Sequence, residues 1–470
     1  MNLGWLALTS TSFGKKVAML TSAIFQLFLG IIMTTTPGAH AQQAQDEVYR
    51  EAFLAFFPLY EMARLRYQAI ETPNPAVSRK INEFSHSRRL LDHRARQVTA
   101  PNNDTLNSSA WLDLSQGPVV LEVPAMGERY YSFHFMNAYT DNTAIVGLRN
   151  AGGGAYRVAI VGPGWNGPVP QHAHRVNADT NDFWLLGRIL ANDEEDAKLV
   201  AQLQDQTYLR PPANAKPGVI QVNAPSLSPS PEEFLKVINE MLQRNPPVGA
   251  AQPRAARARA VGIGLPSVSA QGSGIEASLL EGWAGRFPAL RVQLANPAAI
   301  FRARIGSWFY PPPDVGQWGD RLLLRATVAL RGIGALDAVE AMYFNGITDQ
   351  QGSALDGKKR YRMRVPAGGI PVKAFWSVTM YEATPEGRFF FTLNPINRFS
   401  IGNRTKGLQM NADGSLDVYL QATQPLDAKQ LANWLPTPPG PFRMSLRAYL
   451  PTEELVQGRA QLPIVEEVKD

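Results

Sequence analysis

The sequence predicts a mainly β protein with helical segments, in which two antiparallel β-sandwich or jelly-roll-like domains are joined by a helical connector. Short stretches of alternating apolar and polar residues occur in two groups, at 119–160 and 361–449, as in strands with one buried face. Between these groups the apolar residues recur at helical spacing. The chain has 470 residues with 38 Gly and 36 Pro, which allows two or three hydrophobic cores connected by many turns.

The N-terminus has the three parts of a secretory signal. Lys15 and Lys16 precede the apolar run 17–33, and Ala39-His40-Ala41 has the small residues of a cleavage site. We therefore expect a signal peptide over 1–41 and a mature periplasmic or secreted protein that begins at Gln42. A retained anchor is the alternative, because about 17 apolar residues is the short limit for a membrane span. The mature chain is predicted to contain no transmembrane segment.

The first predicted domain, 42–190, begins with a helical lead-in and continues as a β-sandwich. Aromatic residues at helical spacing predict a helix over 46–70, interrupted at Pro58, with the pattern continuing loosely over 81–91. Alternation then predicts strands at 119–123, 131–135 and 156–160.

The predicted connector, 191–325, is helical. Its acidic start at 193–195 suits a helix N-terminus, and Ser230-Pro231-Glu232-Glu233 forms a capping box that opens a helix to about Arg244. The Ala-, Gly- and Pro-rich stretch 246–273 predicts a flexible loop, and another helical pattern covers 276–304.

Four stretches of alternating apolar and polar residues predict a second sandwich over 326–470. They lie at 361–365, 374–381, 416–421 and 444–449, separated by long loops.

Long motifs in both sandwiches resemble two known families. The stretch 100–162 contains PNNDTLNSSAWLDLSQGPVVLEVP and RYYSFHFMNAYTDN and ends where GPGW begins, and it resembles the domain of unknown function 1254. The stretch 375–450 contains FWSVTMY, NPINRFSIGNRT, NADGSLDVYLQ and NWLPTPPGPFRMSLRAY, and resembles the domain of unknown function 1214. The resemblance implies β-rich domains in exported or envelope proteins of bacteria, and no established reaction. Asn107 departs from the aromatic residue expected after NNDTL, which alters the lining of a pocket there.

Composition excludes several functional classes. Removing Lys15 and Lys16 with the signal leaves 44 basic against 40 acidic residues, a mild charge of +4. Arg254, Arg257 and Arg259 form a local basic cluster without the interleaved aromatics of a nucleic-acid surface. The absence of cysteine excludes thiol nucleophiles, Fe–S clusters and thiolate zinc sites. The sequence has no G-x-S-x-G or Walker motif.

The strongest candidate site is the polar run Asn102, Asn103 and Asp104. These side chains combine donors and acceptors suited to sugar hydroxyls or another polar small molecule. The alternative is that they hold a loop through Asx-turns. Arg129 and Tyr131 begin a later strand, so we expect Asn103, Asp104, Arg129 and Tyr131 to meet at one end of the first sheet. The next polar cluster adds Asp141 as a candidate ligand-binding residue.

Histidines supply the candidates for a base. His134 alternates with Phe133 and Phe135, so two interpretations are open: it faces a solvent-filled groove and acts with Asp104 and Arg129, or it is an exposed or packed strand histidine. His172-Ala173-His174 has the spacing of some metal sites, but no third ligand accompanies it. The sequence therefore predicts no metal and no cofactor.

In the C-terminal domain, Asn397 and Arg404 belong to a polar cluster that either binds an anion or carboxylate, or holds a long loop against the sheet.

Three functions fit these features. The first is binding of a polar small molecule or glycan in the cell envelope, with Trp111, Trp165, Trp376 and Trp434 as aromatic platforms. The second is a hydrolase or lyase that uses Asp104 with His134 or His86, and Arg129 as the electrophile. The third is an envelope structural or interaction protein. Ligand identity and homo-oligomerisation stay open.

Overall fold

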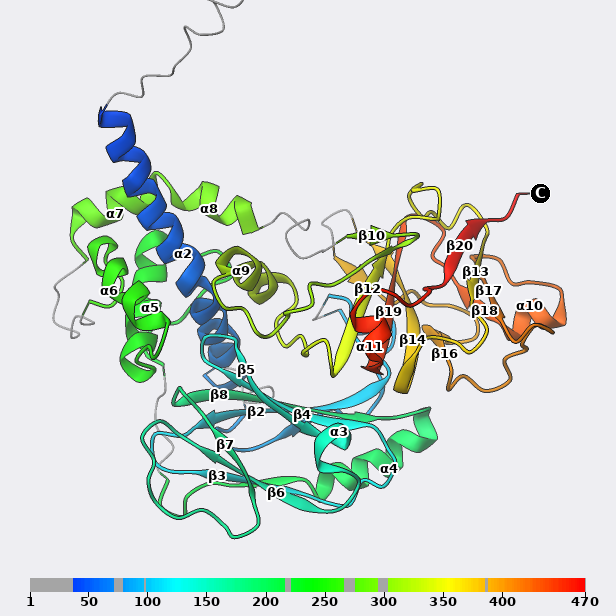
Figure 1. Ribbon diagram of the computed structural model, residues 1–470, viewed down its shortest axis with the longest axis horizontal. Coiled ribbons are helices and arrows are strands. Elements are labelled where there is room, and N and C mark those ends of the chain that lie inside the picture. Colours follow the sequence, from blue (N-terminus) through cyan, green and yellow to red (C-terminus); the bar gives the residue numbers. More distant parts are fainter. Residues whose placement is uncertain are drawn as a thin grey trace, which may run out of the picture. The chain divides into compact units, whose positions relative to one another are not determined.

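The computed structural model describes residues 37–71, 79–96, 99–215, 221–265, 275–294, 303–384 and 388–469 (Figure 1). The chain divides into two compact units, Met1–Val48 and Tyr49–Asp470. The second unit carries the four sheets that are described below, together with helices. The prediction of a mainly β fold with helical segments is confirmed.

The first sandwich packs a five-stranded sheet of order β1-β2-β8-β4-β5 on a four-stranded sheet of order β7-β6-β3-β9. Its core consists of the inward side chains of both sheets, including Leu121, Phe133 and Val158. The strands are β1 (Ser85–His86), β2 (Thr105–Asp113), β3 (Val119–Val123), β4 (Tyr131–Asn137), β5 (Asn142–Gly147), β6 (Tyr156–Val161), β7 (His174–Asn177), β8 (Asp182–Leu190) and β9 (Tyr208–Arg210).

Strand β8 lies between β2 and β4, antiparallel to both. Thr105 pairs with Leu190, and Tyr131 pairs with Ile189. The start of β2 and the start of β4 therefore flank the end of β8. This register places the polar run before β2 at the same end of the sheet as Arg129.

The second sandwich packs a seven-stranded sheet on a four-stranded sheet of order β18-β17-β13-β20. The larger sheet has the order β10-β11-β12-β19-β14-β15, with β16 also paired to β14. Its strands are β10 (Arg304–Ile305), β11 (Trp308–Phe309), β12 (Ala341–Gly346), β14 (Val372–Ala383), β15 (Phe389–Phe390), β16 (Ser400–Gly402) and β19 (Phe442–Pro451). The smaller sheet has β13 (Tyr361–Val365), β17 (Leu416–Gln421), β18 (Trp434–Pro436) and β20 (Ile464–Glu467).

The sheets are not purely antiparallel. Strand β7 pairs with β6, and β18 with β17, in parallel. In each case the parallel strand lies at an end of a four-stranded sheet. The expected antiparallel pairing holds for the other strand pairs of the described residues.

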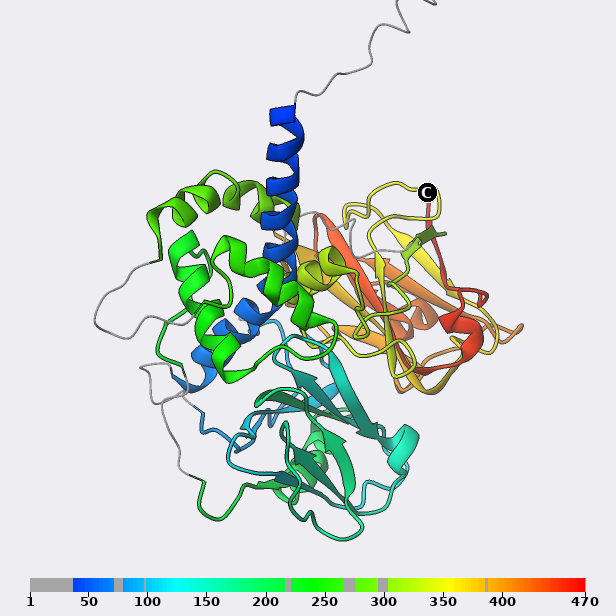
Figure 2. The ribbon, with the colours of Figure 1, turned by 60° about the vertical axis from the view of Figure 1, so that its left-hand side comes forward.

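Helix α2 (Pro37–Ile70) confirms the predicted helix over 46–70 and contains Pro58 without ending there. From Tyr49 onward it packs against α5 (Pro231–Arg244), α7 (Ala277–Ala284) and α8 (Phe287–Leu294) (Figure 2). Aromatic side chains of these helices, among them Phe53, Phe234 and Trp283, form one cluster. The other described helices are α3 (Leu148–Ala151), α4 (Glu194–Asp205), α6 (Ala251–Ala258), η1 (Arg259–Val261), α9 (Leu322–Arg331), α10 (Ala428–Ala432) and α11 (Glu453–Val456).

Local capping explains why the predicted helices α4 and α5 form. Asp193 accepts the backbone N–H of Asp196 at the start of α4. Ser230 accepts the N–H of Glu233 at the start of α5. Only this half of the predicted capping box forms, because the Glu233 carboxylate accepts the Tyr60 hydroxyl at 2.6 Å instead.

Three local predictions are wrong. The expected flexible loop 246–273 contains α6 and η1, where Arg254 pairs with Asp320 and Arg257 pairs with Glu51; residues 266–274 lie outside the described residues. The expected helix 276–304 is divided into α7 and α8 at Gly285, and reaches a strand at Arg304. The loose helical pattern over 81–91 forms turns and β1.

The apolar run of the predicted signal lies outside the described residues, so its cleavage stays a prediction. Within the described part of the chain, no helix has the length and hydropathy needed to cross a membrane.

A buried ion network attaches α2 and α5 to the first sandwich. The carboxylate of Asp182 on β8 accepts two bonds from Arg244, at 2.9 and 2.6 Å, and lies 3.3 Å from the Arg66 guanidinium. Burial alone would raise the pKa of Asp182, but Arg66 and Arg244 outweigh it and hold that pKa below its ordinary value.

Candidate functional site

Residues 99–104, which we call the connecting segment, join the first sandwich to the second. The Ala100 N–H donates to the Phe389 carbonyl at 2.8 Å. Arg447 of β19 donates to the carbonyls of Ala100 and Pro101, each at 3.3 Å. The Asn102 amide donates to the Tyr449 hydroxyl at 2.7 Å. The polar run predicted from the sequence therefore lies directly on the second sandwich.

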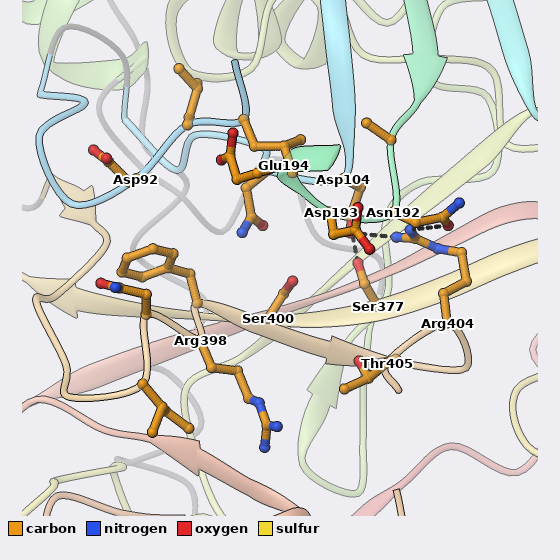
Figure 3. Close-up of a pocket in the computed structure, with 18 of the residues that line it drawn as sticks. Asp92, Asp104, Asn192, Asp193, Glu194, Ser377, Arg398, Ser400, Arg404 and Thr405 are labelled. Atoms are coloured by element: carbon orange, nitrogen blue, oxygen red, sulfur yellow. Dashed lines mark hydrogen bonds and ion pairs between the residues drawn. The ribbon is translucent and has the colours of Figure 1, made fainter. Parts of the chain in front are cut away.

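Asp104 ends this segment and is 2% exposed. Its carboxylate accepts the Ser377 hydroxyl at 2.7 Å and pairs with the Arg404 guanidinium at 3.0 Å (Figure 3). Its backbone N–H donates to the Asn102 side-chain oxygen at 2.6 Å, and its carbonyl accepts the N–H of Ala191 at 3.0 Å. The residue is thus fixed on both its backbone and its side chain.

Beside Asp104 lies a cavity of about 690 Å³, between the first sandwich and the loops around β16. Its walls come from both halves of the chain, which are far apart in sequence. The lining residues are 90–94, 103–104, 191–194, 377, 396–400, 402 and 404–406.

Most charges on the cavity wall are paired with one another. Lys406 lies 3.0 Å from Asp193, and Arg94 holds the pKa of Asp92 below its ordinary value by hydrogen bonding. The Asp196 backbone N–H and then Lys406 lower the pKa of Asp193. These carboxylates are therefore ionised acceptors at neutral pH rather than proton donors.

Arg398 is not paired with an acid. Its guanidinium donates to the carbonyls of Ala432 and Trp434, at 2.9 and 2.8 Å, and points away from Asp104 in Figure 3. Burial lowers its pKa.

Three residues that line the cavity each have one buried polar atom without a hydrogen-bond partner among the described residues: Asn103 Oδ1, Arg404 Nε and His93 Nδ1. The other nitrogens of Arg404 donate to Asp104 and, at 3.1 Å, to Asn192, while its guanidinium lies 4.2 Å above the Phe375 ring. Since most buried polar groups are hydrogen-bonded, three unpartnered atoms around one cavity indicate positions for a ligand or water.

The structure brings together four of the residues singled out from the sequence: Asn103, Asp104, Asn397 and Arg404 all line this cavity. Asn397 is exposed and has a left-handed backbone with φ of 48°. Asp104 and Arg404 were candidates for two separate sites, and the fold joins them in one.

Four other site residues that were predicted from the sequence do not line this cavity. Arg129 shares an end of the sheet with Asp104 but pairs with Asp196 at 2.7 Å. Tyr131 points into the core and donates to the Gly152 carbonyl. Asn102 faces Tyr449, and Asp141, at the opposite end of β4, pairs with Arg325 at 2.6 Å.

Of the two interpretations of His134, the packed strand histidine is confirmed and the solvent-filled groove is wrong. Its ring is fully buried and bonds to Asn142 at 2.5 Å, and burial lowers the pKa of His134 to about 3. His86 bonds to Ser108 at 2.8 Å, and burial lowers its pKa to about 4. Both rings are therefore neutral at pH 7, and neither lines the cavity.

The expected tryptophan platforms are also absent from this cavity. Trp111, Trp376 and Trp434 are core residues, and Trp165 is half-buried elsewhere. The aromatic residue on the wall is Phe399.

Sequence reasoning missed His93, Ser377, Asp193 and Lys406 as lining residues. Lys406 directly follows the motif NPINRFSIGNRT that contains Arg404, and the sequence identifies Asp193 only as part of a helix start. Nothing local distinguishes Ser377 from other strand serines. Across the described ranges, no group of three or more His, Cys, Asp or Glu residues is placed to hold a metal ion.

Comparisons with known proteins agree with this division of the chain. A family model described as "Protein of unknown function (DUF1254)" matches residues 81–211, which contain the whole first sandwich. A second, described as "Protein of unknown function (DUF1214)", matches residues 340–453 in the second sandwich. No curated protein matches the chain.

Two solved structures are similar. The VPA0106 protein from Vibrio parahaemolyticus has a TM-score of 0.69 and 25% identity over 90% of this chain and 100% of that chain. An uncharacterised protein from Burkholderia cenocepacia has a TM-score of 0.42 and 14% identity over 97% of each chain. The chain thus carries a match to the DUF1254 model followed by a match to the DUF1214 model, in the order that the sequence motifs predict.

Proposed function

We propose that this protein binds a polar small molecule or glycan in the cavity beside Asp104. The observation that carries the proposal is a space of about 690 Å³ lined by three residues that each have one buried, unpartnered polar atom. That volume lies within the range of small-molecule sites, which is roughly 300–1,000 Å³. Side chains from both sandwiches meet there, so a bound molecule would contact both.

The chemistry of the wall supports binding over a hydrolase or lyase. A general acid at neutral pH needs a raised pKa, whereas the pKa values of Asp92 and Asp193 are lowered. Arg129, the expected electrophile, is bound to Asp196 and does not line the cavity.

A thermal-shift screen of the mature chain tests the proposal. The panel contains neutral sugars, sugar acids, sugar phosphates, amino acids and small dicarboxylates. A true ligand at about 100 times its Kd adds about 2.7 kcal/mol of stability and raises the melting temperature. The control is Ser400→Trp, which places a large ring in the cavity and should abolish the shift. If no compound shifts the wild type, or the variant shifts equally, this cavity is not the binding site.

We also propose that the protein is exported and acts in the periplasm or outside the cell. The support is the sequence of Lys15-Lys16, the apolar run 17–33 and Ala39-His40-Ala41. Intact-mass measurement of the protein from the cell envelope or medium should give a chain that begins at Gln42. A mass that includes residues 1–41 would instead indicate a retained segment.

A further inference from the structure

We infer that the cavity selects an uncharged, polyhydroxylated ligand such as a saccharide, and that Asn103 and Arg404 form hydrogen bonds with its hydroxyl groups. This inference rests on the proposed function. The inference depends on three features of the wall: its paired charges, the types of its unpartnered atoms and the placement of its apolar residues.

The paired charges disfavour an anionic ligand. Arg404 is bound to Asp104, Lys406 to Asp193 and Arg94 to Asp92, while Arg398 donates to backbone carbonyls. An anion that recruited one of these cations would leave its carboxylate partner uncompensated. The penalty is greatest at Asp104, which is 2% exposed and cannot turn to solvent.

The unpartnered atoms favour a hydroxyl over an ion. Asn103 Oδ1 is an acceptor and Arg404 Nε carries a donor hydrogen. A carboxylate or phosphate offers acceptors, so it can satisfy Arg404 but not Asn103. An ammonium group offers donors, so it can satisfy Asn103 but not Arg404. A hydroxyl is both donor and acceptor, and two hydroxyls on one ring can satisfy both atoms.

Apolar side chains complete the wall. Leu90, Leu91, Ile396 and Phe399 line the same cavity as the polar atoms. A pyranose ring has a polar edge of hydroxyls and apolar C–H faces, so it can contact both kinds of surface at once.

The first test compares ligands that share one ring and differ in charge. Isothermal titration of the mature chain is run with glucose and the neutral disaccharide cellobiose, and with glucuronate, glucose 6-phosphate and glucosamine. We expect a neutral sugar to bind at least tenfold more tightly than every charged counterpart. Equal or tighter binding of a charged compound would overturn the inference and leave the proposed function intact. If none of these five compounds binds, and no compound in the thermal-shift screen raises the melting temperature, the proposed function itself is overturned.

The second test uses Asn103→Ala. Asn103 Oδ1 has no partner among the described residues, so its removal leaves no other group unpaired. The melting temperature of the variant should therefore stay within about 2 °C of the wild-type value. Affinity for the best neutral sugar should fall about tenfold, the value of one hydrogen bond. Asn214→Ala, at an exposed position away from the cavity, should change neither quantity. Unchanged affinity in Asn103→Ala would contradict the role of Asn103.

Discussion

Replacing Asp104 by asparagine should lower the free energy of unfolding by about 3 kcal/mol, because it leaves one partner of a buried ion pair unmatched. Asp104 is 2% exposed, and its carboxylate accepts from both Ser377 and Arg404. The neutral amide cannot compensate the Arg404 guanidinium, and one of its two terminal atoms becomes a donor. Urea denaturation at pH 7 measures the change. Ligand binding should be lost as well, since Arg404 would no longer be held in place.

Asp193→Asn is the matched control. Asp193 also lines the cavity and pairs with a cation, but its side chain is 41% exposed and that of Lys406 is 86% exposed. An exposed pair contributes less than about 1 kcal/mol, and asparagine is as good an N-cap as aspartate. Stability should therefore change by less than about 1 kcal/mol. Equal losses in the two variants would show that burial does not distinguish these carboxylates.

The sequence predicted those strands in which only one face is buried. Strands β3 and β13 alternate regularly between buried and half-buried residues, so their period is visible. Strand β2 is different, because its residues are buried on both faces over much of its length. Its pattern, Thr105–Asp113, mixes polar and apolar residues without a clear period, so the sequence predicts no strand there.

His134 shows the same limit at a single residue. Alternation correctly places it opposite Phe133 and Phe135, but cannot say what covers that second face. In the structure, Asn142 bonds to the ring and also donates to the Ala335 carbonyl and to Asp337. The partner of the ring lies only eight positions later, but it is itself held by a segment about 200 residues further on, beyond the reach of any local pattern.

The sequence predicted several residues of the candidate site, but not that they lie together in one cavity. Asn103, Asp104 and Arg404 were each identified from clusters of polar side chains in a local motif. Their meeting depends on docking between the sandwiches, in which Asp104 and Arg404 are 300 positions apart. Residues such as Ser377, which have no unusual local context, become recognisable only once that docking is known.

Replacing Arg447 by methionine tests that docking and should have the largest effect on stability, a loss on the order of 4 kcal/mol. Arg447 is 4% exposed and donates to the Thr379 hydroxyl at 2.5 Å and the Tyr381 hydroxyl at 2.6 Å. It also holds the carbonyls of Ala100 and Pro101. Methionine fills similar space but donates nothing, so these buried acceptors lose this donor, and the Pro101 carbonyl alone keeps the Tyr381 hydroxyl, at 2.6 Å. Hydrogen exchange should therefore rise first in residues 99–104.

Arg443→Met separates this effect from the mere loss of a buried arginine on the same strand. Burial lowers the pKa of Arg443 to about 10, and its guanidinium lies 4.3 Å above the Phe389 ring. Its Nε has no partner among the described residues, so removal should forfeit the ring contact, about 1 kcal/mol, without leaving carbonyls unpaired. Exchange in residues 99–104 should then resemble the wild type. If both variants lose the same stability, or if exchange in the connecting segment stays unchanged in Arg447→Met, Arg447 does not hold the two sandwiches together through that segment.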